Sequence, residues 1–366
     1  MSEKIKSPKI WAIVVWTIVV IFFGIILFIK FDTGAAAQFT DNFLRPLLGN
    51  TLVGFLEKTY FNTSDKIQQT FDKTGLSSAP EFIDQGIQST ATPIPVANGL
   101  PKVSGEGVWL DHPLKLFPGK EVMAYTFVRP DPSRPYAYVT LVQMDMKAMN
   151  LMAVAGTKQP GGPIGNFGPG KIASDTIASG KLVAAFDGGF QYRDGEYGMI
   201  VGNKTYVPLK QNVGTLVGYK DGTIKIINYT GQDLGQNIAF IRQNCPILVD
   251  NGQIFAINEK DKKLWGRTFN ADIYTWRSGL GVTKDGNLIY AVGNNLGPES
   301  LATALQMAGA TEAIQLDINP FWVRFNIFES KAGGGYTTST LIKSLKDGSN
   351  GYLNGYEKDF FYVYSK

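Results

Sequence analysis

The sequence predicts an α+β fold, mainly an antiparallel β-rich domain with few helices, preceded by one N-terminal transmembrane helix. Four short sequences rich in Gly, Asn and Asp separate apolar, β-prone runs, which is typical of β-hairpins. Only one strong helical pattern, at 299–308, accompanies them. Residues 10–29 contain no charged side chain, and a run of that length crosses a bilayer as one helix. The four hairpin turns are Gly202-Asn203, Asp221-Gly222, Asp250-Asn251-Gly252 and Asp285-Gly286.

Residues 10–30 are expected to anchor the chain in the cell membrane as a single-pass protein. Three lysines within residues 1–9 precede the apolar run, and positive charge stays on the cytoplasmic side, so these residues form a cytoplasmic tail. A cleaved signal peptide is the alternative, with Ala35-Ala36-Ala37 as its cleavage site. The run exceeds the usual apolar core of a signal peptide, which favours an uncleaved anchor. Both alternatives place the bulk of the chain outside the cytoplasm.

Composition narrows the function classes. With 366 residues, 44% of them hydrophobic, the chain can bury a substantial core. Its single cysteine, Cys245, allows no intrachain disulfide and no cysteine-based zinc site. Its single histidine, His112, argues against imidazole-rich metal sites and against a Ser-His-Asp triad. The net charge of +4 comes without a basic run interleaved with aromatics, so we expect no nucleic-acid partner.

Residues 31–104 are expected to form membrane-proximal helices followed by a linker. Apolar residues at 38–60 have helix-compatible spacing that is broken at Pro46 and Gly49, which predicts one or two short amphipathic helices. From Ser77 to Val103 the composition shifts to Ser, Thr, Pro and Gly, which indicates a linker or an extended wrap.

Residues 105–366 contain the β-rich domain. Residues 136–144 and 151–155 are predicted strands, and 182–186 is a short apolar strand that ends on Asp187-Gly188-Gly189-Phe190. Residues 298–308 are a predicted helix, with a proline suited to its first turn and Gly309 at its end.

The strand after this helix delivers polar groups to its end. From 314 to 319 apolar residues alternate with Gln315, Asp317 and Asn319, and Pro320 then stops the ladder because it has no N–H to donate. The pattern therefore predicts a carboxylate and a carboxamide side by side at a strand end. A buried strand with a satisfied aspartate is the alternative interpretation.

Four polar motifs lie beside glycines or at strand ends. Arginines among apolar strands are costly to bury unless they pair with carboxylates or with an anionic ligand, and both alternatives stay open. Two glycines after Asp187 would let backbone N–H groups approach a ligand closely. The motifs are Asp187-Gly188-Gly189-Phe190, Arg242-Gln243-Asn244, Trp276-Arg277-Ser278-Gly279-Leu280-Gly281 and Leu316-Asp317-Ile318-Asn319-Pro320.

Their order along the chain resembles the phosphodiester glycosidase family over roughly residues 105–366. The family has a strand ending in Asn-Gly-Gly-Phe, to which Asp187-Gly188-Gly189-Phe190 is similar. It also has an arginine before a Gly-x-Gly-x-x-x-Asp-Gly hairpin, as at 277–286, and a Leu-Ala helix before Gly-Ala, as at 301–310. The chain departs from the family where Leu-Asp-Gly-Gly-Gly-Ser is usual, because it has Leu-Asp-Ile-Asn-Pro-Phe at 316–321.

The resemblance implies a hydrolase that cleaves a glycosyl phosphodiester of a cell-envelope or extracellular glycan, with a glycan or sugar phosphate as its partner. Such a reaction needs a positive clamp for the phosphate and carboxylates near the anomeric carbon. Asp187 and Asp317 are the expected catalytic pair. The expected substrate-binding and phosphate-binding residues are Gly188, Gly189, Arg242, Asn244, Arg277, Asn319 and Trp322, with Trp276 as a second sugar-stacking candidate.

Two further expectations concern a cation and the alternatives to catalysis. Asp317 and Asn319 share a strand face, so an oxygen-liganded cation such as calcium is a candidate cofactor. The altered Asp317 motif also fits a catalytically inactive protein of the same fold that binds envelope polysaccharide. A scaffold that recruits envelope enzymes through its membrane-proximal helices is another alternative.

Overall fold

The computed structural model describes residue 16 and residues 39–75, 78–84, 86–255, 262–265 and 273–366. The predicted transmembrane segment at 10–30 lies outside these residues, apart from Trp16. Within the described part of the chain, no helix combines the length and the apolar character that a membrane crossing requires.

The chain divides into two compact units, residues 1–57 and 58–366. The first contains the π-helical turn η1 (Thr40–Leu44) and the beginning of helix α3 (Arg45–Lys73). The helix is interrupted at Gly49, where φ is 79°. Sequence predicted a break here, but the helix continues beyond residue 60, so the structure has one longer kinked helix instead of short separate ones. Pro46 is the second residue of α3 and follows the π-helical turn η1 with only Arg45 between them.

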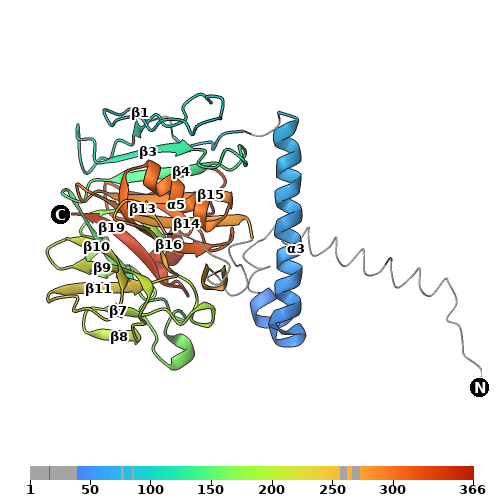
Figure 1. The fold of residues 1–366 in the computed structure, drawn as a ribbon. Helices are drawn as coiled ribbons and strands as arrows, with labels where there is room; N and C mark the ends of the chain where they lie inside the picture. Colours follow the sequence, from blue (N-terminus) through green and yellow to red (C-terminus); the bar gives the residue numbers. More distant parts are fainter. Residues whose placement is uncertain (1–15, 17–38, 76–77, 85, 256–261, 266–272) are drawn as a thin grey trace, which may run out of the picture. The chain divides into compact units, whose positions relative to one another are not determined.

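The second unit contains three sheets, and every strand pair in them is antiparallel among the described residues (Figure 1). The nine-stranded sheet has, in spatial order, β1 (Ile87–Gln88), β2 (Leu110–Asp111), β3 (Met123–Val128), β4 (Val139–Met144), β15 (Leu288–Leu296), β14 (Thr275–Thr283), β16 (Ala310–Ile318), β12 (Ile247–Asp250) and β13 (Gln253–Ile254).

The other two sheets have five strands each. One has the order β10 (Ile224–Tyr229), β9 (Val213–Tyr219), β11 (Ile238–Gln243), β7 (Met199–Val201) and β8 (Lys204–Val207). The other has the order β18 (Tyr336–Thr340), β17 (Phe325–Ser330), β6 (Leu182–Asp187), β19 (Phe360–Ser365) and β5 (Met149–Val154). The α-helices of this unit after α3 are α4 (Ser174–Ala178), α5 (Pro298–Met307) and α6 (Ser349–Asn354). The predicted α+β class with mainly antiparallel strands is therefore confirmed.

Local turn chemistry places the hairpins as predicted. The four Gly/Asn/Asp turns connect β7 to β8, β9 to β10, β12 to β13 and β14 to β15. Gly222 has φ 90°, a conformation that suits glycine because it has no Cβ. The predicted strand at 136–144 is shorter in the structure, where β4 begins at Val139.

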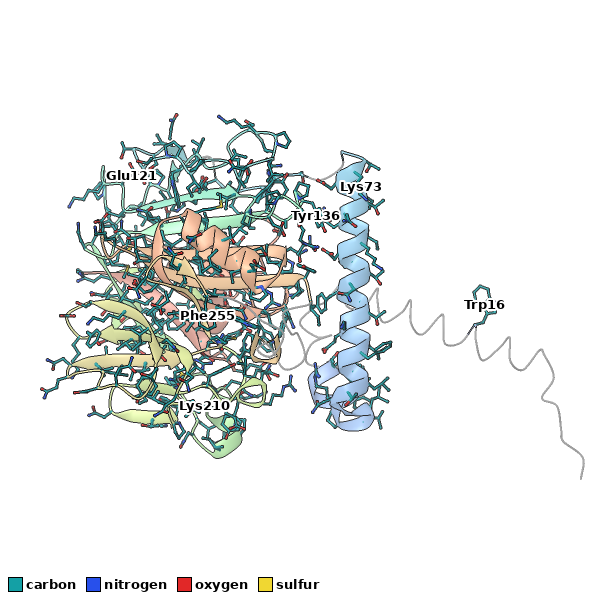
Figure 2. The ribbon with its side chains drawn as sticks, in the orientation of Figure 1. Trp16, Lys73, Glu121, Tyr136, Lys210 and Phe255 are labelled. Atoms are coloured by element: carbon teal, nitrogen blue, oxygen red, sulfur yellow. The ribbon has the colours of Figure 1, made fainter. Side chains whose placement is uncertain are left out.

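The predicted linker and the end of α3 both run along the β-rich domain. Backbone N–H groups of Ile83 and Ser89 donate to carbonyls of Leu341 and Trp109 at 3.3 and 2.9 Å, so this segment is an extended wrap. Asp65 of α3 accepts from the side chain of Arg134 and, at 3.4 Å, from the hydroxyl of Tyr136; Figure 2 labels this tyrosine.

Aromatic side chains fill the core where strands of two sheets meet. Phe186 of β6 lies 5.0 Å from the ring of Tyr290 on β15, 5.8 Å from Phe325 on β17 and 5.7 Å from Phe361 on β19. These side chains are at most 1% exposed. The cluster fixes the end of β6, which carries Asp187, against the nine-stranded sheet.

Helix α5 packs closely on β14 because β14 has glycines at the contact. The side chain of Leu305 is fully buried. Its methyl carbons would lie 3.1 and 3.4 Å from Cβ atoms placed on Gly279 and Gly281. Gly309 follows the end of α5 with φ 87°, as the sequence predicted for the glycine that terminates this helix.

We expect Leu305→Ala to lower the free energy of unfolding by about 2–5 kcal/mol, because it removes buried methyl groups and leaves a cavity over β14. Urea unfolding monitored by circular dichroism measures the free energy of unfolding. Thr303→Ala, on the same helix but outside the core, should change it by less than about 0.5 kcal/mol. Equal losses in the two variants would contradict the packing described here.

Candidate functional site

Asp187 is the last residue of β6, and its side chain is only 3% exposed. Four donors converge on its carboxylate, two hydroxyls and two backbone N–H groups. Burial raises the pKa of Asp187, while the hydrogen bonds favour the ionised form. The donors are the hydroxyls of Ser278 and Tyr290 (2.7 Å for Tyr290) and the N–H groups of Asp317 (3.3 Å) and Arg324 (3.0 Å).

Asp317 lies one residue before the end of β16 and is also 3% exposed. One of its carboxylate oxygens accepts a hydrogen bond from the Lys358 ammonium, and the other accepts one from the N–H of Ile318 at 3.0 Å. Burial raises the pKa of Asp317 to about 7 against the effect of Lys358, which lowers it, and the nearby Asp187 carboxylate raises it further. A carboxyl group with this pKa can exchange a proton near neutral pH.

The two predicted aspartates are brought together by Ser278 of β14. The Ser278 hydroxyl donates to the Asp187 carboxylate and accepts from the backbone N–H of Asp317 at 3.0 Å. Since all three residues are buried, their relative positions are fixed by packing and by hydrogen bonds at once. The structure thus places both expected catalytic residues in one polar cluster.

Arg242 of β11 is held by Asp359, which lies immediately before β19. The Arg242 Nε donates to Asp359 at 2.7 Å, and a terminal nitrogen donates to the other carboxylate oxygen at 3.2 Å. Its remaining N–H groups donate to the backbone carbonyls of Phe190 (2.8 Å), Tyr197 (3.3 Å) and Gln243 (2.7 Å). Of the two readings that the sequence left open, the internal ion pair is the one formed here.

Gly188 and Gly189 make room for this ion pair. A Cβ on Gly188 would collide with the Asp359 carboxylate, and one on Gly189 would lie 2.6 Å from an Arg242 nitrogen. The N–H of Gly189 donates to Asp359 at 2.9 Å. The two glycines therefore allow their backbone to approach Asp359 of the same protein closely, and not a bound ligand.

Asn244 ties the loop after β6 to β16. Its side-chain amide donates to the carbonyls of Gln315 and Leu316 at 2.9 and 2.6 Å, and its oxygen accepts from the N–H of Phe190 at 3.0 Å. The residue is fully buried, and it positions the strand that carries Asp317.

Arg277 of β14 is also fully buried. Its nitrogens donate to the carbonyls of Leu296 and Ile273 at 2.8 and 3.0 Å and to the Gln315 side chain at 3.0 Å. Burial lowers the pKa of its guanidinium to about 10. These bonds connect β14 with β15 and β16.

Asn319, Phe321 and Trp322 belong to the turn that follows β16. Asn319 has φ 79°, and its side-chain oxygen accepts from the N–H of Phe321 at 2.7 Å. Trp322 is 8% exposed, and the Lys358 ammonium lies 4.6 Å from its ring centroid, a cation–π contact. Trp276 is half-buried and packs against the core.

The donor set around Asp317 and Asn319 does not fit calcium. Calcium takes six to eight oxygen ligands. Both carboxylate oxygens of Asp317 already accept hydrogen bonds, one of them from the Lys358 ammonium, which a cation would have to displace. Among the side chains that the structure describes, no group of three or more metal-ligating residues is found.

Sequence reasoning missed the residues that complete the cluster. Lys358 and Asp359 are a charged pair directly before the apolar strand 360–364, and that position was the available signal. Both are at most 2% exposed. Ser278 lay within a recognised motif without a role, while Tyr290 and Arg324 read as ordinary strand and loop residues.

The stretch of chain that carries most of this cluster is similar to a known family of enzymes. Residues 180–317 match the model of the phosphodiester glycosidase family, which confirms the resemblance inferred from the motifs. That stretch begins just before β6 and ends at Asp317, so it contains both aspartates.

Among solved structures, the catalytic domain of zebrafish N-acetylglucosamine-1-phosphodiester alpha-N-acetylglucosaminidase is similar at 13% identity and a TM-score of 0.40, over 70% of this chain and 88% of that one. A hypothetical protein from Synechocystis matches at 13% identity and a TM-score of 0.36, over 68% of this chain and 63% of that one. A putative exported protein from Burkholderia pseudomallei K96243 matches at 10% identity and a TM-score of 0.24, over 62% and 74%. No curated protein matches the sequence.

Asp317 should make stability fall as pH rises. The folded protein keeps a proton on Asp317 up to pH about 7, whereas an unfolded chain releases it near pH 4. Between these values the folded state binds more protons, so raising the pH lowers the free energy of unfolding. In Asp317→Asn this contribution is absent. Thermal unfolding of both proteins from pH 4 to 7 should show a steeper decline for the wild type; parallel curves would contradict the assignment.

Arg242→Gln should lower the free energy of unfolding by about 3–5 kcal/mol, because it leaves the buried Asp359 carboxylate without its cation. Chemical denaturation measures the loss. Lys115→Gln, which removes an exposed ion pair with Glu329, should cost at most about 1 kcal/mol. An Arg242→Gln protein of normal stability would instead favour the phosphate-clamp role that the sequence suggested.

Proposed function

We propose that this protein is a membrane-anchored, extracytoplasmic hydrolase that cleaves a glycosyl phosphodiester of a cell-envelope or extracellular glycan. The family match over residues 180–317 supports a glycosidase-type reaction. The observation that carries the proposal is the buried Asp317 carboxyl, whose pKa is raised to about 7 beside Lys358. Perturbed carboxyl groups of this kind are typical of acid–base catalysis.

In the proposed reaction, Asp317 transfers the proton. The anomeric C–O bond breaks through an oxocarbenium-like transition state, Asp317 gives its proton to the departing oxygen, and a phosphomonoester leaves. Water adds to the anomeric carbon, and the proton that this water loses returns to Asp317. Lys358 holds the Asp317 side chain in place and balances its charge once the proton has left. Asp187 acts on the same centre as a fixed polar group, because four donors orient its carboxyl group beside Asp317.

The membrane anchor in this proposal is the segment 10–30. Its support is the uncharged run 10–29 with Lys4, Lys6 and Lys9 before it. An orientation with the N-terminus in the cytoplasm delivers residues 105–366 to the envelope, where phosphodiester-linked sugars would be the substrate.

A binding protein without turnover is the second candidate, and two observations favour it. The family's glycines and serine after the aspartate are replaced here by Ile318-Asn319-Pro320-Phe321. In addition, Arg242 is engaged within the protein, so it is not placed as a phosphate clamp. An inactive member of the fold would retain such a structure and bind envelope polysaccharide without cleaving it.

Release of free sugar from a panel of sugar-1-phosphodiesters tests the proposal, using the full chain in mild detergent with and without calcium. Asp317→Asn should lower the rate by about 10²–10⁴-fold, the usual worth of a positioned proton-transfer group. Asp221→Asn, in an exposed hairpin turn, should leave the rate unchanged. Suppose that the wild type cleaves none of these compounds, while sugar phosphates still raise its melting temperature. That result would favour the binding protein.

A further inference from the structure

Arg324 is a buried cation at the edge of the polar cluster. It follows the turn after β16 and is 9% exposed. Its Nε donates to the carbonyl of Phe321 at 3.2 Å, and one terminal nitrogen donates to the carbonyl of Asp347 at 3.4 Å. The guanidinium carbon lies 5.2 and 5.5 Å from the ring centroids of Phe321 and Tyr356. The group is therefore held in contact with two aromatic side chains.

Within the part of the chain that the structure describes, no carboxylate pairs with Arg324. The carboxylates of this region have other partners: Asp317 is paired with Lys358, Asp359 with Arg242, and a carboxylate oxygen of Asp347 accepts hydrogen bonds from Asn326 and Ser349. Asp187 contacts Arg324 through the backbone N–H. A guanidinium taken out of water without an anion is costly, so a ligand anion would relieve a cost that the protein itself leaves in place.

Two tyrosine hydroxyls beside Arg324 also lack a partner. The hydroxyls of Tyr352 and Tyr356 are buried, and neither makes a hydrogen bond among the described residues. Their rings are 5.3 Å apart in an edge contact. The Arg324 guanidinium lies 5.5 Å from the Tyr356 ring centroid, so the contacts of Tyr356 connect all three groups. Burial raises the pKa of both hydroxyls, and the charge of Arg324 lowers it. Buried donors without acceptors are uncommon in native proteins and point to a missing acceptor.

We propose that Arg324, Tyr352 and Tyr356 bind the phosphate group of the substrate. A guanidinium offers parallel N–H donors that match two phosphate oxygens, and each hydroxyl can donate to a further oxygen. This inference rests on the proposed function, because it takes the phosphate to be that of the scissile diester.

The site lies next to the proposed proton-transfer group. Phe321, which contacts the Arg324 guanidinium, also contacts Trp322 at 4.3 Å between ring centroids, and the Lys358 ammonium lies over Trp322. Tyr356 is two residues before Lys358, and the Asp317 carboxylate raises the pKa of the Tyr356 hydroxyl. A phosphate at Arg324 would therefore place the bond to be cleaved on the side of Asp317.

Tyr356→Phe separates a ligand site from a purely structural one. The variant removes a buried hydroxyl that has no partner, so the free protein should be as stable as the wild type or more stable. The same variant should bind phosphate more weakly, about fivefold or more. Melting temperatures of the full chain, measured with and without inorganic phosphate or glucose 1-phosphate, report both effects. Loss of stability together with unchanged phosphate binding would overturn the proposal.

Arg324→Gln should weaken binding of both phosphate probes by about 10- to 100-fold, because charge-assisted hydrogen bonds are lost. Arg324→Lys should retain only part of the wild-type affinity for these probes. Arg129→Gln is the matched control, since it removes another buried arginine, the partner of Glu106. It should lower stability but retain the phosphate-induced shift.

The wild type must also respond to phosphate and not to glucose alone. Absence of a phosphate-induced shift in the wild type, or its persistence in Arg324→Gln, would overturn the inference. The two proposals fail separately. Turnover of sugar-1-phosphodiesters that is insensitive to Arg324→Gln would retain the hydrolase and exclude this phosphate site. Phosphate binding that depends on Arg324 without any turnover would retain the site and exclude the hydrolase.

Discussion

The three sheets depend on two consecutive charged residues, Lys358 and Asp359. Both lie in the short segment before β19, and their side chains reach different sheets. Lys358 pairs with Asp317 at the end of the nine-stranded sheet. Asp359 pairs with Arg242 of β11 in one five-stranded sheet, while the chain itself continues into β19 of the other. Since each partner is almost completely buried, neither pair can be broken without leaving a charge in the core.

This arrangement explains why the loop after β6 contains two glycines. β19 lies beside β6, with Phe360 opposite Asp187, so Asp359 is close to the loop backbone. Side chains at Gly188 or Gly189 would meet the Asp359–Arg242 pair. In this chain the two glycines are thus needed to build the core.

The elements that sequence analysis placed well are those determined by nearby residues. Turn chemistry defined the four hairpins, and the change from helical to alternating periodicity defined α5 and β16. The partner of Arg242 is 117 residues further along the chain, and no local pattern identifies it. For the same reason the sequence left open whether the arginines pair internally, and it did not connect Tyr352 or Tyr356 with Arg324. Long-range pairing of buried polar groups is decided by strand order, which periodicity does not reveal.

The order of the charged residues along the chain has a consequence for biosynthesis. Arg242 and Asp317 both precede Lys358 and Asp359, so a ribosome makes each core charge before its counter-ion. Until β19 is added, the centre of the domain contains a cation and a carboxyl group without their partners, and β6 lacks one of its two neighbouring strands. The strand order therefore makes burial of the core wait for the synthesis of β19. Partly made chains would keep this polar centre accessible to water until the strand that completes it has emerged.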